Sequence, residues 1–426
     1  MQYQPESDTP PRKQIKAPLG SRFQFVDTSD EEQTAAKIPA VSALSLGAAN
    51  FAGAPRKLII WQSTVIWAVS RVIIILFTAV AAQSLGQAPH ISTALQNWYR
   101  WDANWYISIA QNGYTSATMT AFFPLFPILL KIAAAILPGH SYVLAAMLLN
   151  SVFTWIGLVG MGTLAYSESA DTSTVFPTLM VFMAYPVIFF LSAPYTEALF
   201  IALAVWGLWA IRQKKWYLAA GLTFLVVVSR PTGIILYAPL VYEFVVSIYK
   251  NKTLQIKDYA PAAASLLSAP LGLTLYSWYN LVKFGDPLAW LHAQSAWNRI
   301  SVPIWQAIIE EAQFYIHKPT SIDLAATLLL IGFIIIAYKK QPMAYTLYSV
   351  ALLFLIVSAP IHLSYYAPGS ASVTSAARFV IAAIPLFLYL GKLSSKHTAV
   401  TAIAVYGGLL LQGIFILRFL TGVWVN

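Results

Sequence analysis

The sequence predicts an all-α polytopic membrane protein, and three observations support this fold class. Hydrophobic residues make up 58% of the 426 residues and charged residues only 10%, whereas soluble domains average about 45–50% and about 25%. Apolar segments of helical length recur along most of the chain. Aromatic residues reach 14%, which is typical of the belts that such proteins carry at both membrane surfaces.

Residues 1–57 differ from the rest of the chain. They are rich in Pro, Ser, Thr, Gln and Ala, carry both charge signs and have no sustained apolar period. Such a composition cannot bury a core, so we expect a flexible cytoplasmic tail at 1–57 and a polytopic transmembrane domain at 58–426. Arg56 and Lys57 directly precede the first span, roughly 58–82, which places the N-terminus inside.

We expect about 11 transmembrane helices, one further segment that does not cross the membrane, and interfacial helices in the outer loops. In loop 83–118, Trp98, Trp101 and Trp105 fit one face of a short helix that lies on the membrane surface. Besides the first span, the crossing segments are 142–165, 174–192, 197–211, 216–230, 232–249, 259–281, 321–338, 343–359, 379–391 and 398–418. Segment 119–137 contains Pro124, Pro127 and Lys131. Cation placement is consistent only if this segment fails to cross, so we interpret it as a re-entrant or partial helix. The alternative is a full crossing with one weak assignment elsewhere.

The formal net charge of +10 is interpreted as a topology signal, and no nucleic-acid partner is expected. The cation clusters expected in the cytoplasm are Arg212 to Lys215, Lys250 to Lys252, Lys339-Lys340 and Lys392 to Lys396. The outer side then receives nearly all the unusual polar residues, in the loops and turns 83–118, 192–197, 229–233, 282–320 and 360–378. We expect loops 83–118, 282–320 and 360–378 to form the active-site face.

Asp102 is the leading catalytic candidate, because it is an acid among tryptophans in a chain with few charges. A carboxylate at the membrane surface can take the proton of an acceptor hydroxyl in an inverting glycosyl transfer. Aromatic neighbours offer faces for a sugar ring, and the residues expected to line the substrate here are Arg100, Trp101, Trp105 and Tyr106. The alternative is a surface carboxylate paired with Arg100.

Arg378 and Arg230 are the candidates for binding the donor phosphate. An arginine near the membrane is costly unless it is paired or lines a wet cavity. A guanidinium also suits the phosphate of a departing polyprenyl phosphate. The alternative role is a structural salt bridge, for example to Glu197 or Glu243.

Glu197 begins a helix after a Pro-Tyr-Thr turn, so it is either an N-terminal cap or a second acid facing Asp102. His362 is a candidate for a phosphate or hydroxyl contact, and otherwise an interfacial residue. Tyr195 and Tyr365 are expected to line the substrate.

No cofactor is predicted with certainty. The chain has no cysteine, and His292, His317 and His362 lack metal-ligand spacing. No sequence motif therefore supports a divalent metal site, although a metal stays an open alternative. No Gly-rich phosphate loop and no acidic pair of the DxD type, which binds nucleotide sugars, is present. A lipid-linked donor that enters from the bilayer therefore fits better than a soluble nucleotide sugar.

An ordered set of short motifs resembles the PIG-V-like mannosyltransferase family. These motifs are Arg100-Trp101-Asp102, Trp105-Tyr106, Asn112-Gly113-Tyr114, Phe122 to Pro127, Ala193 to Glu197, Ser229 to Gly233, Ser375 to Phe379 and Pro385 to Phe387. They cover the chain from about 58 to 390. The family includes the second mannosyltransferase of glycosylphosphatidylinositol anchor assembly, and we expect this chain to be a bacterial homologue.

The resemblance implies a GT-C glycosyltransferase fold, a polyprenyl-phosphate-mannose donor, inversion, and Asp102 as the base. Acceptor identity stays open between a glycolipid, a glycan and a protein hydroxyl. The expected location is the bacterial cytoplasmic membrane with the active site on the outer face, or the endoplasmic reticulum membrane in a eukaryote. A flippase or transporter of lipid-linked sugars, and a GT-C transferase of another prenyl-linked sugar, remain the alternatives.

Overall fold

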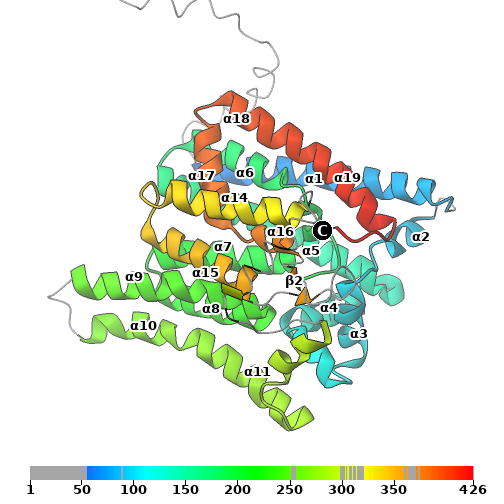
Figure 1. Ribbon diagram of the computed structural model, residues 1–426, viewed down its shortest axis with the longest axis horizontal. Helices are drawn as coiled ribbons and strands as arrows, with labels where there is room; N and C mark the ends of the chain where they lie inside the picture. Colours follow the sequence, from blue (N-terminus) through cyan, green and yellow to red (C-terminus); the bar gives the residue numbers. More distant parts are fainter. Residues whose placement is uncertain are drawn as a thin grey trace, which may run out of the picture. The chain divides into compact units, whose positions relative to one another are not determined.

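A computed structural model describes residues 55–87, 90–250, 256–297, 321–358, 361–362, 371–372 and 375–425, with isolated positions between 303 and 313. Most of the expected tail lies outside the described residues, and its last three residues begin the first helix. The described secondary structure is almost entirely helical (Figure 1), which confirms the all-α class.

The first part of the described chain joins two long helices through a series of short ones. These elements are α1 (Pro55–Ser84), α2 (Ile91–Gln96), α3 (Asp102–Asn112), η3 (Ala117–Ala121), α4 (Leu125–Ile136), η4 (Pro138–His140) and α5 (Tyr142–Ser169). Of these, α2, α3 and η3 fall within the expected outer loop 83–118 and its boundary with the next segment.

The central part consists of shorter helices, several of them separated by tight turns. These elements are η5 (Thr172–Thr174), α6 (Val175–Met183), η6 (Ile188–Leu191), α7 (Glu197–Arg212), α8 (Trp216–Ser229), η7 (Pro231–Leu236), α9 (Tyr237–Lys250), α10 (Ile256–Leu266), α11 (Ser268–Phe284), α12 (Ala289–His292) and η8 (Ala293–Trp297).

The last part contains six further α-helices, a π-helical turn and one short strand pair. These elements are α14 (Ile322–Ala337), α15 (Met343–Ser358), β1 (Ile361–His362), β2 (Ala371–Ser372), α16 (Ala376–Val380), α17 (Ile384–Ser394), α18 (Thr398–Ala402), η9 (Ile403–Gly407) and α19 (Gly408–Leu420). The two strands pair antiparallel, with Ile361 opposite Ser372.

Four helices are long and apolar enough to cross a membrane, namely Pro55–Ser84, Tyr142–Ser169, Pro231–Tyr249 and Thr398–Leu420. The shorter apolar helices are Leu125–Ile136, Thr172–Met183, Trp216–Ser229, Ile322–Ala337, Met343–Ser358 and Ile384–Ser394. Helices this short rise less than the roughly 30 Å of a hydrocarbon core. The expected number of about 11 crossings therefore stays a prediction.

Helix α4, in the segment predicted to be re-entrant, has twelve residues, which rise about 18 Å. It follows a non-helical turn at Phe122 and ends before Pro138. This length suits partial insertion better than a full crossing.

Prolines divide two of the expected segments. Segment 259–281 forms α10 and α11, which meet at Leu267. Pro270 lacks the N–H that would bond to the carbonyl of Leu266, and this explains the break. Segment 379–391 is likewise divided between α16 and α17, with Pro385 in the first turn of α17.

Glycines allow α5 to pack closely against α7. A Cβ at Gly157 would lie 3.3 Å from Ile201, and one at Gly160 would lie 2.8 Å from Val205. Close approach of apolar helices through small residues is a main source of helix association in a bilayer. This packing fixes the start of α7, where Glu197 lies.

Candidate active site

A strained turn directs Asp102 inward at the start of α3. Trp101 precedes the helix with φ 48° and ψ −117°, a conformation that is costly for a bulky L-residue. The turn is anchored by Trp98, which is fully buried and donates its indole N–H to Thr78 Oγ1 at 3.0 Å. The expected interfacial stretch is thus a buried anchor followed by a short helix.

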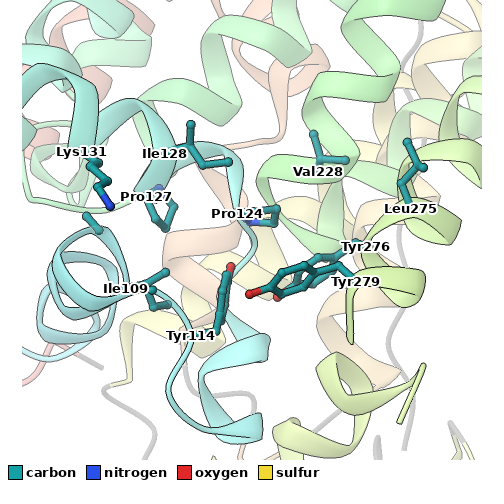
Figure 2. Close-up of a pocket in the computed structure, with 12 residues that line it drawn as sticks. Ile109, Tyr114, Pro124, Pro127, Ile128, Lys131, Val228, Leu275, Tyr276 and Tyr279 are labelled. Atoms are coloured by element: carbon teal, nitrogen blue, oxygen red, sulfur yellow. The ribbon is translucent and has the colours of Figure 1, made fainter. Parts of the chain in front are cut away.

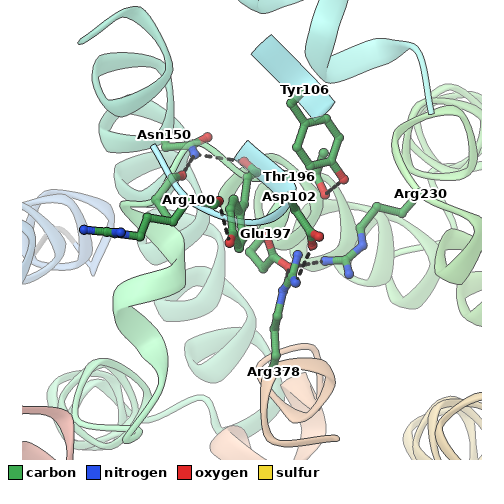
Figure 3. A network of polar contacts seen from close by, with 10 residues as sticks. Arg100, Asp102, Tyr106, Asn150, Thr196, Glu197, Arg230 and Arg378 are labelled. Atoms are coloured by element: carbon green, nitrogen blue, oxygen red, sulfur yellow. Dashed lines mark hydrogen bonds and ion pairs between the residues drawn. The ribbon is translucent and has the colours of Figure 1, made fainter. Parts of the chain in front are cut away.

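Arg100 points away from Asp102 (Figure 3). Its guanidinium donates to the carbonyl of Leu420 at 3.1 Å and to that of Asn97 at 3.3 Å. A cation there stabilises the C-terminal end of α19. The structure therefore shows no Arg100–Asp102 pair and gives Arg100 a position that braces α19, while its substrate-lining role stays a prediction.

Four charged side chains from distant parts of the chain form one network (Figure 3). Arg378 donates through Nη1 to Asp102 Oδ2 at 2.6 Å and through Nε to Glu197 Oε1. Arg230 donates through Nη1 to the same oxygen of Glu197 at 2.7 Å. Asp102, Glu197, Arg230 and Arg378 were each singled out in the sequence, and the structure brings all four together.

Exposure within this network is lowest at Glu197, its centre, and highest at Asp102, one of its two ends. The side chain of Asp102 is 25% exposed and that of Arg230 14%, whereas Arg378 retains 9% and Glu197 only 2%. Asp102 Oδ1 accepts no hydrogen bond within the described part of the chain. Asp102 is consequently the carboxylate that a substrate can reach, and Glu197 is the buried centre that holds both arginines.

Aromatic rings enclose the two guanidinium groups. Arg378 lies 4.5 Å from the ring centre of Tyr195 and 5.2 Å from that of Phe190. Arg230 lies 5.5 Å from the ring centre of Phe379. These cation–π contacts exclude water from the arginines and strengthen their electrostatic interactions.

The predicted lining tyrosines brace this arrangement from the buried side. Tyr195 donates its hydroxyl to the carbonyl of Arg100 at 3.1 Å, and Tyr106 shares a hydrogen bond of 3.2 Å with Thr196. Burial raises the pKa of Tyr106 to about 12 and that of Tyr195 well above its ordinary value. Neither phenol can act as a base near neutral pH.

The predicted lining tryptophans are half-buried. Trp105 stacks on Phe122 with ring centres 5.7 Å apart, and Trp101 meets Trp424 edge-on at 5.2 Å. Tyr365 lies outside the described residues. His362 belongs to β1, but the position of its side chain is not described. Neither prediction is tested by the structure.

No group of three or more His, Asp or Glu residues within the described part of the chain could hold a metal ion. His292 pairs with Asp286 at 2.7 Å in an exposed turn after α11. This hydrogen bond lowers the pKa of the Asp286 carboxyl. His317 lies outside the described residues.

Asp323 is a site-supporting residue that the sequence analysis missed. Its Oδ2 accepts the backbone N–H of Ser375 at 2.6 Å and its Oδ1 that of Ala377 at 2.8 Å. Ser375 has φ 82°, and Arg378 follows directly after Ala377. The sequence did contain a signal for Asp323, because a carboxylate at the start of a strongly apolar helix needs hydrogen-bond partners.

Asn150, in the middle of α5, was also missed. Its side-chain amide donates to the carbonyls of Ala193 and, at 2.9 Å, of Tyr195. These bonds hold the turn that leads into Glu197. A lone amide inside an apolar span was the signal, because polar groups at that depth need partners.

A cavity of about 410 Å³ lies beyond the far end of α3, between α4, α8 and α11 (Figure 2). Its wall is mainly apolar, with Ile109, Pro127 and Leu275 among its members, and Lys131 is its only charged residue. Tyr114 and Tyr276 lie on the same wall and donate their hydroxyls to the carbonyls of Phe122 and Thr120.

The sequence also shows relatedness to characterised proteins. The family model described as mannosyltransferase (PIG-V) matches residues 64–275, a range that includes Asp102, Glu197 and Arg230 and ends before Arg378. GPI alpha-1,6-mannosyltransferase 2 of Rattus norvegicus is 28% identical over 203 residues, which are 44% of this chain and 41% of the relative.

The protein of the same name from Cricetulus griseus is 29% identical over 204 residues, again 44% of this chain and 41% of the relative. The chain thus spans about two fifths of the length of these curated relatives. No solved structure matches the sequence.

Proposed function

The chain belongs to the PIG-V-like mannosyltransferase family, and we propose that it transfers mannose from a polyprenyl-phosphate donor to a hydroxyl acceptor with Asp102 as general base. The observation that carries the proposal is the Asp102–Arg378–Glu197–Arg230 network, whose most exposed member is the carboxylate. A general base must reach the substrate proton, while its supporting charges are best held out of water.

In the proposed step the acceptor oxygen attacks the anomeric carbon of the donor as the bond between that carbon and the phosphate oxygen breaks. The hydroxyl proton passes to Asp102 Oδ1, and polyprenyl phosphate leaves with the bonding electron pair. Attack opposite the leaving group inverts the anomeric configuration. Oδ2 stays bonded to Arg378, which orients the carboxylate.

The charge of the network supports this assignment. Two carboxylates and two guanidinium groups make it formally neutral before transfer. When Asp102 takes the proton, the network gains one positive charge just as the departing phosphate gains one negative charge. Arg378 and Arg230 then stabilise the phosphate, each through N–H groups that remain after its bonds to the carboxylates.

A lipid-linked donor suits the surroundings of the site. The apolar cavity begins near Ala110, about 12 Å along α3 from Asp102, and it contains a single cation, Lys131. An isoprenoid chain matches such a wall, whereas a nucleotide would meet few polar partners. We also propose that the chain has the GT-C glycosyltransferase fold that the family resemblance implies.

The apolar helices and the family support an integral membrane protein. We place the active site on the outer face of a bacterial cytoplasmic membrane, because the cation clusters favour the opposite helix ends for the cytoplasm. The matched relatives are named for α-1,6 mannosyl transfer in GPI, so glycolipids are the first acceptors to test.

The test supplies the purified protein with labelled polyprenyl-phosphate-mannose and a panel of glycolipid, glycan and peptide acceptors, and detects products by mass spectrometry. Polyprenyl-phosphate-glucose serves as the competing donor. Asp102→Asn should lower transfer by about 10²–10⁴-fold while donor binding persists. Asp171→Asn, which removes an exposed carboxylate from the turn between α5 and α6 and outside the expected active-site face, should retain transfer.

Full transfer by Asp102→Asn would remove the base assignment. Preferred use of the glucose donor would overturn the choice of mannose. Movement of intact lipid-linked sugar across vesicles, without transfer to any acceptor, would instead favour a flippase.

A further inference from the structure

A second polar pocket lies at the end of the helices opposite the proposed active site. Helix α7 begins at Glu197, in the network, and ends at Arg212, about 22 Å away. Arg212 contacts Glu168, which lines a pocket of about 80 Å³ between α5, α6, α15 and α17. The predicted membrane topology places this end in the cytoplasm.

The acid of this pocket is already paired. Glu168 accepts two hydrogen bonds from Arg212, at 2.9 and 3.2 Å, and a third of 2.7 Å from the hydroxyl of Tyr345. Arg212 also binds Glu243 at 2.6 Å. These three charged groups together carry one net negative charge, which is less than the charge of two lysines.

Two lysines of the pocket carry uncompensated charge. Lys340 and Lys392 both line it, both are exposed, and neither pairs with a carboxylate in the part of the chain that the structure describes. The nearby Asp171 is bonded to Ser173 through both carboxylate oxygens. The pocket thus presents a net positive lining.

The remaining wall combines hydroxyl groups with apolar surface. Ser169 and Thr174 lie on one side, and Leu388 and Tyr389 of α17 lie half-buried on the other. A volume of about 80 Å³ exceeds the roughly 10–15 Å³ that one water needs, so a tetrahedral anion fits. Apolar wall beside it suits the start of an acyl chain.

We propose that this pocket binds the phosphate group of an anionic phospholipid, with Lys340 and Lys392 as its cations. Basic pockets between helices at the cytoplasmic surface recognise such headgroups. Because α7 joins Arg212 to Glu197, a lipid here would stabilise the same helix that holds the active-site arginines. The lipid site is independent of the transfer chemistry.

The test titrates the full chain in neutral detergent with short-chain phosphatidylglycerol, phosphatidylcholine and inorganic phosphate, and measures binding by thermophoresis. Phosphatidylglycerol should bind best, and Lys340→Gln with Lys392→Gln should weaken it about tenfold. The double variant Lys340→Arg with Lys392→Arg keeps both charges and should bind phosphatidylglycerol like the unmodified protein. This comparison shows whether weaker binding of the glutamine variant comes from lost charge or from misfolding.

The matched control is Lys214→Gln with Lys396→Gln, which removes the same charge from exposed lysines outside the pocket. It should alter phosphatidylglycerol binding less than twofold. Equal weakening in both double variants, or equal binding of phosphatidylcholine, would overturn the site. Tighter binding of inorganic phosphate than of the lipid would make the ligand a soluble phosphate and overturn the phospholipid.

Discussion

Arg378 links Asp102, which lies 276 residues earlier in the chain, to the buried carboxylate of Glu197. One guanidinium thus joins the start of α3 to the start of α7. Arg230 reaches the same Glu197 oxygen from the junction of α8 and η7. Glu197 is therefore the residue through which three separate helix ends are held together.

Glu197→Gln should destabilise the protein strongly, because it leaves two buried guanidinium groups with a single carboxylate partner. Removing one member of a buried pair costs about 3–5 kcal/mol, and the Glu197 side chain is almost fully buried. We expect a clear fall in the melting temperature of the detergent-solubilised protein, measured by thermal denaturation, together with lost transfer.

Asp102→Asn is the matched comparison, since it removes a carboxylate from the accessible end of the same network. Its melting temperature should fall much less, although its transfer activity is lost. Equal losses of stability in the two variants would contradict the distinction between a buried centre and an accessible base.

Asp323→Asn should lower kcat by roughly 10- to 100-fold with little change in donor KM. The variant loses the acceptor for one of two backbone N–H groups, those of Ser375 and Ala377 just before Arg378 in the chain, and a displacement near 1 Å can cost this much in rate. Steady-state kinetics at several donor concentrations separate the two constants. Unchanged values of both kcat and donor KM would show that Asp323 does not position Arg378.

The charged residues of the site were predictable because charges are so rare in this chain. Asp102, Glu197, Arg230 and Arg378 stood out. The alternative role was a salt bridge for Asp102 and the two arginines, and a helix cap for Glu197. The structure shows that all four are paired in one network of salt bridges, and their roles in catalysis and phosphate binding belong to the proposed function. Which residues would pair depended on contacts across hundreds of residues, and local patterns carry no such information.

The helix-forming segments were also predictable, because apolar stretches of this length have few alternatives in a bilayer. The orientation of single side chains was not. Arg100 and Asp102 are separated in the chain only by Trp101. The strained turn at Trp101 nevertheless sends their side chains in different directions. The role of Asp323 depended on a contact with the start of α16, more than 50 residues later in the chain.

Gly391→Ala should destabilise the protein by about 1–3 kcal/mol. A Cβ at this position would lie 1.9 Å from Thr178 Oγ1 and 2.5 Å from its Cα, where α17 crosses α6. The backbone of α6 or of α17 must therefore move to accommodate the added methyl group. Thermal denaturation measures the effect, and Gly332→Ala is the control, because nothing lies within 4 Å of its Cβ.

Gly332→Ala should instead be neutral or stabilise by up to about 1 kcal/mol, through higher helix propensity alone. Similar melting temperatures for the two variants would contradict the close packing of α6 against α17.

Single cysteines can decide the course of α4 through the membrane, because the chain contains no cysteine of its own. Ser116 and His140 are exposed positions on either side of α4, and Ser173 is exposed beyond the far end of α5. If α4 is re-entrant, Ser116→Cys and His140→Cys should both react with a membrane-impermeant maleimide added outside. Ser173→Cys should react only after permeabilisation, because the 28 residues of α5 rise about 42 Å and can cross. Labelling of Ser116→Cys and His140→Cys from opposite sides would show that α4 crosses, and the positive-inside assignment of the later helices would then need one more or one fewer crossing.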